Sequence, residues 1–579
     1  MRPLLRLRSL ITAHTAARRT AARHVARCAA LGLTASALLA PSPLAAVAPL
    51  AMPQTAGTGK GASKAATKPK AKPKAKPAAK TKAATKAATK AATKPATRKR
   101  SSAPTRRTTK AVPVLRHTTP RGEIALAADL HALLTARTTS GAWGVLVSSL
   151  SHGDTLFAFR GDAPMLPAST LKLYTTALAF DRLGPGHQLS TAILRDGSVD
   201  ADGTLRGSLY LQGGGDPSLS TRYAGGAGPD APMAALARLV ADAGITRIRG
   251  DVVGDASAFD SKRIPDGWLA RYLNDSYAAR VSALSLNENL LNVAIAPGKG
   301  QSGVVTLQPA TVAYKVVNNT RTIAGSRASK LVVSRTSDGT IVARGTIGSR
   351  SQPKVYQVVV DDPALMTTGA FRKALERQGI TVDGELRMGD TPPSSERVAT
   401  YRSPPLSTLA GDMNRESVNH IAELLFRSAG RPGAPDGVGS AERANMALRQ
   451  FLTQKVGARA DAVSAADGSG LSTLDRITAR SLVQLLGYAN RAQWGTEFHQ
   501  SLPVAGKSDM LRRRMVATPA AGNLHAKTGT TSEVIALGGY VTARNGELLA
   551  FSFLYNGTDR WRARETIDAM GATLADWSR

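Results

Sequence analysis

The feature that most constrains this chain is an apolar segment at residues 166–180, which carries a serine and a lysine three positions apart. Pro167 suits the first turn of a helix, and the residues that follow are apolar almost all round, as in a helix buried inside a sizeable domain. Residues i and i+3 share a helix face, so the hydroxyl of Ser169 and the amine of Lys172 can meet. A serine needs an adjacent base to act as a nucleophile, and burial can keep a lysine neutral enough to be that base.

The Ser-x-x-Lys pair is a weak signal when it is taken alone. A chain of this length contains such a pair about once or twice by chance, and a serine on a helix surface is the ordinary alternative. The 579 residues predict two or three domains, so the pair needs support from other motifs.

Most of the positive charge lies before the first acidic residue. The net charge is +35, but 27 of the 76 Lys and Arg residues precede Glu123, and the remainder has 49 basic and 41 acidic residues. The basicity therefore belongs mainly to the N-terminal tail, and no specific nucleic-acid partner is expected. The only cysteine is Cys28, and the nine histidines show no close metal-ligand spacing, so neither a disulfide framework nor a metal or other cofactor is expected.

Two N-terminal segments differ from the rest in composition. Residues 1–50 combine a basic stretch, a short apolar run and small residues, which predicts an export signal and a periplasmic or envelope location. An uncleaved anchor and a misassigned start codon are the alternatives. Residues 51–121 are rich in Lys, Ala, Thr and Pro and predict a disordered tether, which is either a spacer or a contact for an anionic envelope surface.

The body alternates helical and extended patterns. Helices are expected at 126–134, 231–243, 370–378, 417–429, 439–456 and 560–576. Strands are expected at 143–149, 155–160, 248–253, 304–307, 330–334, 340–345, 354–360, 384–388, 535–543 and 547–555. The last two strands are joined by Asn545-Gly546, a strong hairpin signal.

Two further motifs support the Ser169 assignment. Ser417-Val418-Asn419 is expected to open a helix, and Lys527-Thr528-Gly529-Thr530 lies directly before the hairpin strand. The S-x-x-K, S-x-N and K-T-G combination, in this order, is the set shared by penicillin-binding proteins and related β-lactamases.

Three residues of the first two motifs have the chemistry that the proton transfers of acyl transfer require, and a fourth can hold the base in place. Ser169 is the expected nucleophile, Lys172 its base, and Ser417 the relay that protonates the leaving amine. Asn419 is expected to hold the lysine and to hydrogen-bond the substrate amide.

The third motif fits substrate binding. Lys527 would attract an anionic substrate terminus, and Thr528 and Thr530 can bind its carboxylate. Gly529 lets the substrate approach the strand edge, and backbone N–H groups of Ser169 and Thr530 are expected to form an oxyanion hole.

The body resembles the D-alanyl-D-alanine carboxypeptidase/endopeptidase family, the class C low-molecular-mass penicillin-binding proteins. The matching stretches are 167–172, 211–217, 254–255, 282–289, 413–414, 467–472 and 525–530. The resemblance implies an α/β fold, in which a penicillin-binding transpeptidase-like (serine β-lactamase-like) domain of antiparallel sheet and helices is interrupted by inserted sheet-rich domains. The expected catalytic domain is 122–205 with 395–579, and the insertion is 206–394.

The family's activity is hydrolysis of the terminal D-Ala-D-Ala bond and of the peptide cross-links of peptidoglycan, with covalent inhibition by β-lactams such as penicillin. Two departures from its pattern, Val418 inside the second motif and Arg415 near it, bear on specificity and rate more than on the reaction class.

Alternatives from other classes stay open at this point. A serine β-lactamase shares all three motifs, and residues 288–292 match the run that carries the deacylating glutamate of class A enzymes, although here the run precedes Ser417 and is expected in a strand. A non-catalytic binding protein would need none of the reactive residues, and a Ser-His-Asp hydrolase would need a G-x-S-x-G elbow, which the sequence lacks. Trp268, Tyr272 and Tyr277 are expected either to pack or to line a pocket for the peptide side chain.

Overall fold

The computed structural model describes residues 116–136, 138 and 140–579, which lie in a compact unit at 113–579. The expected export signal and nearly all of the expected tether lie outside the described residues. Among the described helices, none has the length and apolar character needed to cross a membrane.

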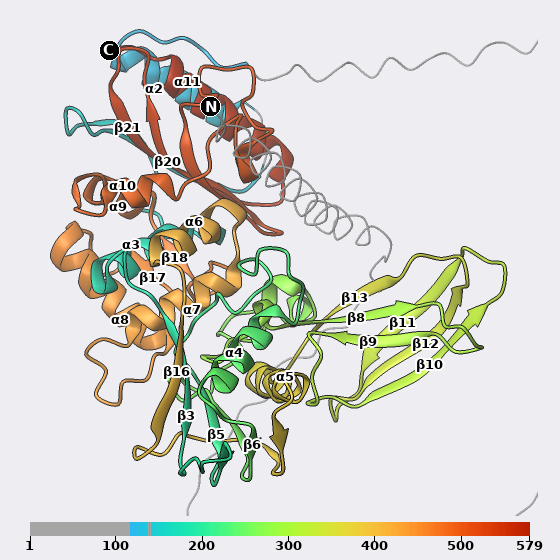
Figure 1. Ribbon diagram of the computed structural model, residues 1–579. Helices are drawn as coiled ribbons and strands as arrows, with labels where there is room; N and C mark the ends of the chain where they lie inside the picture. The colour runs from blue at the N-terminus through green and yellow to red at the C-terminus, as the bar shows by residue number, and fades with distance from the viewer. Residues whose placement is uncertain (1–115, 137, 139) are drawn as a thin grey trace, which may run out of the picture. The chain divides into compact units, whose positions relative to one another are not determined.

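A five-stranded antiparallel sheet organises the part of the chain that carries the three motifs (Figure 1). Its strand order is β19-β20-β21-β1-β2, with bounds His525–Thr530, Val534–Thr542, Leu548–Asn556, Ala142–Ser149 and Thr155–Phe159. The first three strands come from the end of the sequence and the last two from the start of the folded part. The hairpin expected around Asn545-Gly546 is confirmed to within a residue, because β20 pairs with β21 from Thr542↔Leu548 onward.

Helices cover both faces of this sheet, and the alternation of side chains along the strands explains why. On β20, Ile535 and Leu537 face a core with α2 (Glu123–Thr135) and α11 (Arg560–Asp576), which lie side by side in Figure 1. Ala536 and Tyr540 face the opposite core, where α3 (Leu171–Leu183) and α9 (Ala479–Arg491) lie. Successive side chains of a strand point to opposite faces, so one run of apolar residues serves two helical layers.

The second layer continues into a cluster of helices around α3. It contains α6 (Leu406–Glu416), α7 (Asn419–Gly430), α8 (Ala441–Phe451) with the π-helical turn Leu452–Val456, and α10 (Gly495–Gln500). A two-stranded ladder, β17 (Val463–Ser464) with β18 (Arg476–Ile477), and a 3-10 turn η6 (Asp509–Leu511) lie in the same part of the sequence. The expected helices at 439–456 and 560–576 are therefore present.

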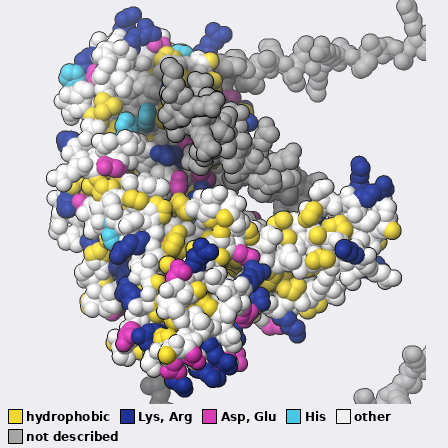
Figure 2. All heavy atoms as spheres, viewed as in Figure 1, with side chains coloured by type: hydrophobic (Ala, Val, Ile, Leu, Met, Phe, Trp, Pro, Cys, Tyr) yellow, Lys and Arg dark blue, Asp and Glu magenta, His cyan; other side chains and the backbone are white. Residues whose placement is uncertain are grey.

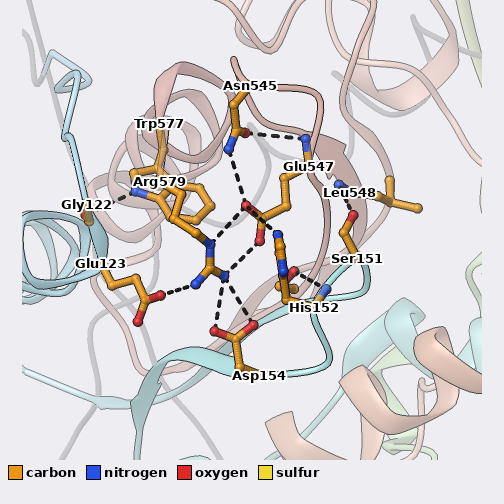
Figure 3. A network of polar contacts seen from close by, with 11 residues as sticks. Gly122, Glu123, Ser151, His152, Asp154, Asn545, Glu547, Leu548, Trp577 and Arg579 are labelled. Carbon is orange, nitrogen blue, oxygen red and sulfur yellow. Dashed lines mark hydrogen bonds and ion pairs between the residues drawn. The ribbon is translucent and has the colours of Figure 1, made fainter.

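A polar network joins the start of the folded part, residues 122–154, to its end, residues 545–579 (Figure 3). The Arg579 guanidinium pairs with the buried Glu547 at 3.0 Å, with Asp154 at 3.1 Å and with Glu123. Trp577 Nε1 donates to the carbonyl of Gly122 at 3.1 Å. Because these groups lie on α2, on the β1–β2 turn and on the β20–β21 hairpin, the network joins three elements that are distant in sequence.

The last residues of the expected tether are ordered. Thr118 N donates to Thr573 Oγ1 at 3.1 Å, and Thr119 Oγ1 donates to Asp576 Oδ2 at 2.7 Å. The prediction of disorder up to residue 121 is therefore wrong for residues 118–121, because polar groups of α11 hold this short stretch.

A second five-stranded sheet lies within the sequence between the first and second motifs. Its order is β15-β7-β5-β3-β16, with bounds Leu386–Met388, Val252–Asp255, Leu209–Gly213, Ser190–Arg195 and Glu396–Arg402. A small parallel sheet, β14-β6-β4, adds Thr381–Val382, Arg247–Ile248 and Thr204–Leu205. The single strand expected at 248–253 is wrong: the chain bends at Gly250, which lies against Gly207, and β6 and β7 enter different sheets.

Two helices and two further sheets complete the insertion. Helix α4 is Ala231–Asp242, and α5 is Pro363–Arg377, which begins seven residues before the expected helix because the Asp362 carboxylate caps Leu365 N at 3.0 Å. One sheet has the order β13-β8-β9, with Lys354–Val359, Leu290–Ala296 and Val304–Gln308. The other has the order β10-β12-β11, with Val316–Ile323, Ile341–Gly348 and Ser329–Arg335.

The strand pairing bears on the domain boundaries. Strands β3 and β16, which fall inside the expected catalytic segments 122–205 and 395–579, pair with each other, and β3 also pairs with β5 of the insertion. We therefore propose that the insertion begins near residue 189 and ends near 403, because backbone ladders commit both strands to its sheet.

Candidate active site

Ser169 lies in η1 (Ala168–Thr170), the 3-10 turn that leads directly into α3. The turn is held from both sides by backbone that could not carry a side chain. A Cβ on Gly529 of β19 would come within 2.7 Å of the Pro167 carbonyl oxygen, and a Cβ on Gly470 within 1.9 Å of the Ala168 carbonyl oxygen. Glycine is thus required at both positions for the close approach of strand and loop to the serine.

Lys172 extends from the first turn of α3 and is completely buried. Its Nζ lies 2.9 Å from Ser169 Oγ, 2.7 Å from Asn419 Oδ1 and 2.8 Å from the Ser469 carbonyl oxygen. The oxygens of Asn419 and Ser469 can only accept hydrogen bonds. A neutral Lys172 amine would therefore donate its two N–H groups to them, and its lone pair would face the Ser169 hydroxyl. The three contacts therefore suit a base that removes the proton of Ser169.

Burial favours the neutral form of Lys172 near physiological pH. Burial lowers the pKa of Lys172 from 10.5 to about 7, and the nearby carboxylates of Asp467, Glu423 and Asp475 offset part of this effect. Burial also raises the pKa of Glu423 to about 7, with the Asp467 charge as the second cause.

Ser417 does not open a helix, which corrects the expectation from sequence. It follows the last residue of α6 with φ 61° and ψ 40°, a left-handed conformation, and α7 begins only at Asn419. A side chain is rarely held in this conformation unless the surroundings impose it. The bend between the two helices leaves Ser417 Oγ 2.9 Å from Lys527 Nζ.

Lys527 lies on β19, the edge strand of the first sheet, and is also completely buried. Its Nζ donates to Ser417 Oγ and, at 2.9 Å, to the Thr528 carbonyl oxygen. Burial, and next the positive charge of Lys172, hold the pKa of Lys527 well below its usual value. Thr528 and Gly529 are buried, whereas Thr530 is exposed at the end of the strand.

Asn419 links the helical cluster to the insertion. While its Oδ1 accepts from Lys172, its Nδ2 donates to the Tyr277 carbonyl oxygen at 2.8 Å. Tyr277 lies in η3 (Ser276–Ala278), and its ring packs edge-on against Tyr272 of η2 (Ala270–Tyr272) at 5.7 Å. Tyr272 Oη in turn lies 3.3 Å from Ser532 Oγ, two residues beyond the third motif. All the residues singled out by the three motifs are thus brought together, with the insertion beside them.

The loop at residues 467–472 is a part of the site that motif reasoning missed. The buried Asp467 carboxylate accepts from the backbone N–H groups of Ser469, Gly470 and Ser472 at 3.0, 2.6 and 2.8 Å. Trp268 Nε1 donates to the same carboxylate at 2.7 Å, so this tryptophan is a buried support rather than a pocket wall. The loop so held presents the Ser469 carbonyl to Lys172. In the sequence, the run Asp-Gly-Ser-Gly at 467–470 is the signal that marks this loop.

Glu288 has a different environment from that of a deacylating glutamate beside Ser169. It lies in η4 (Asn287–Asn289) with φ 59°, and only the last three residues of the run 288–292 enter β8, so the expectation of a strand is wrong for its first two. Its carboxylate pairs with Arg222 at 3.0 Å, and Arg222 also pairs with Glu416 at 2.7 Å. The glutamate is therefore engaged by an ion pair.

Comparisons with known proteins point to one family. The D-Ala-D-Ala carboxypeptidase 3 (S13) family profile matches residues 126–577. The D-alanyl-D-alanine carboxypeptidase of Actinomadura sp. is 33% identical over 467 residues, which cover 78% of this chain and 84% of the relative. The D-alanyl-D-alanine carboxypeptidase DacB of Haemophilus influenzae is 25% identical over 424 residues, 72% of this chain and 85% of the relative.

A solved structure confirms the expected fold class. The crystal structure of penicillin-binding protein 4 from Haemophilus influenzae is similar with a TM-score of 0.63 at 24% identity, covering 76% of this chain and 98% of that protein. The fold, the family profile and the 33% identical relative agree, and the chain therefore belongs to the D-Ala-D-Ala carboxypeptidase 3 (S13) family of serine D-Ala-D-Ala carboxypeptidases.

Proposed function

We propose that this protein removes the terminal D-alanine from peptidoglycan stem peptides through an acyl-enzyme on Ser169, and that it also cleaves peptide cross-links. The observation that carries the proposal is the continuous polar chain from Ser169 through Lys172 to Asn419, with the Ser417–Lys527 pair beside it. A nucleophile, a buried base and a second hydroxyl paired with another lysine are the groups that acyl transfer from a D-Ala-D-Ala amide needs.

Acylation begins when neutral Lys172 takes the proton of Ser169 as Oγ attacks the carbonyl carbon of the penultimate D-Ala. The negative charge that develops on the carbonyl oxygen is stabilised by the backbone N–H groups of Ser169 and Thr530. Ser417 then donates its proton to the leaving nitrogen, the C–N bond breaks, and Lys527 returns a proton to Ser417. The products are free D-Ala and an ester on Ser169.

The terminal carboxylate of the substrate binds at the third motif. Lys527, Thr528 and Thr530 offer a cation and two hydroxyls, and Asn419 holds the substrate amide. An arriving carboxylate stabilises the protonated form of Lys527, and the Lys527 charge in turn favours the neutral form of Lys172. Substrate binding therefore prepares both proton transfers.

Before deacylation, the proton that Lys172 took from Ser169 passes on and replaces the one that Lys527 gave up, so Lys172 is neutral again. Water then attacks the ester carbonyl with Lys172 as its base, the ester C–O bond breaks, and Lys172 gives the proton to Ser169 Oγ. A bound cross-link is cleaved by the same steps with a longer leaving group. Attack of Ser169 on a β-lactam would open the ring and leave the opened drug as an ester on Ser169. The amine leaving group stays attached to this acyl group, so slow hydrolysis of the ester is expected. The structure of penicillin-binding protein 4 from Haemophilus influenzae in complex with a novel β-lactam supports the expectation that this chain binds β-lactams. The carboxylate of Glu288, held by Arg222, offers no support for a class A β-lactamase.

The location of this chemistry follows from its substrate. We propose that the protein is exported to the cell envelope by residues 1–50 and that the Lys-rich segment 51–117 spaces the enzyme from an anionic surface or contacts that surface. The composition of both segments supports this arrangement.

Penicillin labelling of the full chain tests the proposal. Wild type and Ser169→Ala are each incubated with a fluorescent penicillin and followed by intact mass, while D-Ala release is measured on a peptide ending in D-Ala-D-Ala. A lasting adduct and D-Ala release by wild type alone are expected. Rapid loss of the adduct with destruction of the drug would favour a β-lactamase, and equal labelling of the Ser169→Ala variant would refute the acyl-serine mechanism.

A further inference from the structure

The positive charge of the folded body is concentrated in one segment. Residues 297–360, here called the basic lobe, hold nine Lys and Arg residues and one acidic residue, Asp338. The other residues from Glu123 onward hold 40 basic and 40 acidic residues. The excess charge of the body therefore lies entirely in the basic lobe, which contains β9 to β13.

These cations are directed to solvent. Arg335 is half-buried and pairs with Asp361, while the other eight basic residues are exposed. They are Lys299, Lys315, Arg321, Arg327, Lys330, Arg344, Arg350 and Lys354. Figure 2 shows Lys and Arg side chains at the end of the lobe that carries β10, β11 and β12.

Strand register places three of the cations on one face of the β10-β12-β11 sheet. Arg321 of β10 lies opposite Thr346 of β12, and Lys330 of β11 lies opposite the same threonine. Arg344 is two positions from Thr346 on the central strand. Residues in one cross-strand row, and residues two apart along a strand, point to the same side.

The opposite face of this sheet is the one that folding buries. Ile341, Ala343 and Ile347 of β12 alternate with the outward positions and belong to the hydrophobic core of the insertion. Val332, next to Lys330 on the outward side of β11, is 46% exposed. The outward face is therefore an open surface of cations with small polar and aliphatic side chains between them.

The three cations lie close enough to repel one another. Strand spacing and rise place the Cα atoms of neighbouring cations about 8 to 10 Å apart. Within the described part of the chain, neither Arg321, Lys330 nor Arg344 has a hydrogen bond or ion pair through its side chain. A repeated anion laid across the strands would relieve this repulsion, whereas a single carboxylate would meet only part of it.

The lobe and the active site share a structural element. Strand β13 packs against η3, and η3 presents the Tyr277 carbonyl that accepts from Asn419. Through β13 and η3 the lobe is connected to Asn419, so a polymer that binds the lobe is held on the same folded unit as the catalytic groups.

We propose that the outward face of the β10-β12-β11 sheet is a docking surface for peptidoglycan itself, bound through the carboxylates that its peptides repeat along the polymer. The proposal rests on the proposed function, because the docked polymer is the one that carries the peptides cleaved at Ser169. Docking raises the local concentration of scissile peptides without any new contact in the active site. It predicts a preference for polymer over free peptide that falls with salt.

The test reverses the three charges in the full chain with Arg321→Glu, Lys330→Glu and Arg344→Glu together. D-Ala release is measured on a soluble D-Ala-D-Ala peptide and on insoluble peptidoglycan from which acid has removed phosphate-containing polymers. At low ionic strength the rate on the polymer is expected to fall about tenfold, while the rate on the soluble peptide stays unchanged. Added salt is expected to bring wild type down to the level of the variant.

The control variant reverses three exposed cations outside the lobe, Arg238→Glu, Arg402→Glu and Arg491→Glu, and leaves the Lys-rich N-terminal segment in place. An equal loss on polymer in the control variant, an unchanged ratio of polymer to peptide rates, or an equal loss on both substrates would overturn the proposal. A loss seen only on walls that retain their phosphate polymers would also overturn it.

The docking test can fail separately from the proposed function. If wild type released no D-Ala from either substrate, the proposed function would fail, and docking would be measured by co-sedimentation of wild type and variant with the same peptidoglycan. Weaker co-sedimentation of the triple variant than of the control variant supports docking, and equal co-sedimentation refutes it.

Discussion

Replacing Lys172 with Met tests the base most directly, because methionine has a similar length but cannot take a proton. An amine with a pKa of 10.5 is neutral in only about one molecule in 3,000 at pH 7, whereas one with a pKa of about 7 is neutral in half of them. Burial therefore raises the available base by about 10³-fold at neutral pH. We expect Lys172→Met to lower the second-order rate of penicillin acylation by at least about 10³-fold.

The pH profile carries the same information in wild type. A lysine whose pKa is lowered loses its proton as pH rises through about 7, so acylation should rise with pH and level off above 8. Between pH 8 and pH 6 the neutral fraction falls from about nine-tenths to about one-tenth, which predicts a tenfold lower rate. Stopped-flow or quenched labelling with fluorescent penicillin at constant ionic strength measures this rate.

Two controls identify the titrating group. Ser169→Ala should not label at any pH. Lys527→Gln should acylate more slowly and keep the rise, displaced to higher pH because the Lys527 charge no longer favours neutral Lys172. A rate that is flat between pH 5 and 9 would refute the assignment of Lys172 as the base. A rise that persists in Lys172→Met and disappears in Lys527→Gln would transfer the role to the other lysine.

Three further substitutions probe the site and its support. Gly470→Ala forces a Cβ to within 1.9 Å of the Ala168 carbonyl oxygen at a φ of +84°. The rate of acylation by penicillin should therefore fall at least about 10²-fold. An unchanged labelling rate would contradict the close approach of the loop to Ser169. Ser417→Ala removes the proton relay and should lower D-Ala release by about 10²- to 10⁴-fold with an unchanged melting temperature, whereas normal turnover would rule out the relay. Arg579→Ala leaves the buried Glu547 carboxylate without its guanidinium and should destabilise the fold, which is read as a lower melting temperature. An unaltered melting temperature would mean that the network in Figure 3 adds no stability.

Much of the secondary structure around the active site could be predicted from the local sequence pattern. The alternating runs around Asn545-Gly546 specify a hairpin, and the apolar periodicity of residues 560–576 specifies the helix that covers it. Such signals survive in isolation because the period of a strand or a helix depends on neighbours only a few residues away. The three motifs likewise could be recognised without any contact map.

Local pattern failed where tertiary packing overrides it. Ser417 adopts a left-handed conformation that a serine does not favour by itself, and only the junction of α6 with α7 imposes it. The pairing of β3 with β16, on which the proposed boundaries near 189 and 403 rest, joins residues about 200 positions apart and leaves no local trace in the sequence.

The sequence by itself determined the reactive residue types, their order and the elements that carry most of them. Tertiary structure alone decided that Lys172 is buried, that the Ser469 carbonyl and Asn419 take its two N–H groups, and that Tyr277 of the insertion orients Asn419. Side-chain chemistry is encoded residue by residue, but a pKa and a hydrogen-bond direction depend on which distant groups the fold brings within about 3 Å. A motif therefore identifies the nucleophile Ser169, but only the folded chain places beside it a lysine that can remove its proton.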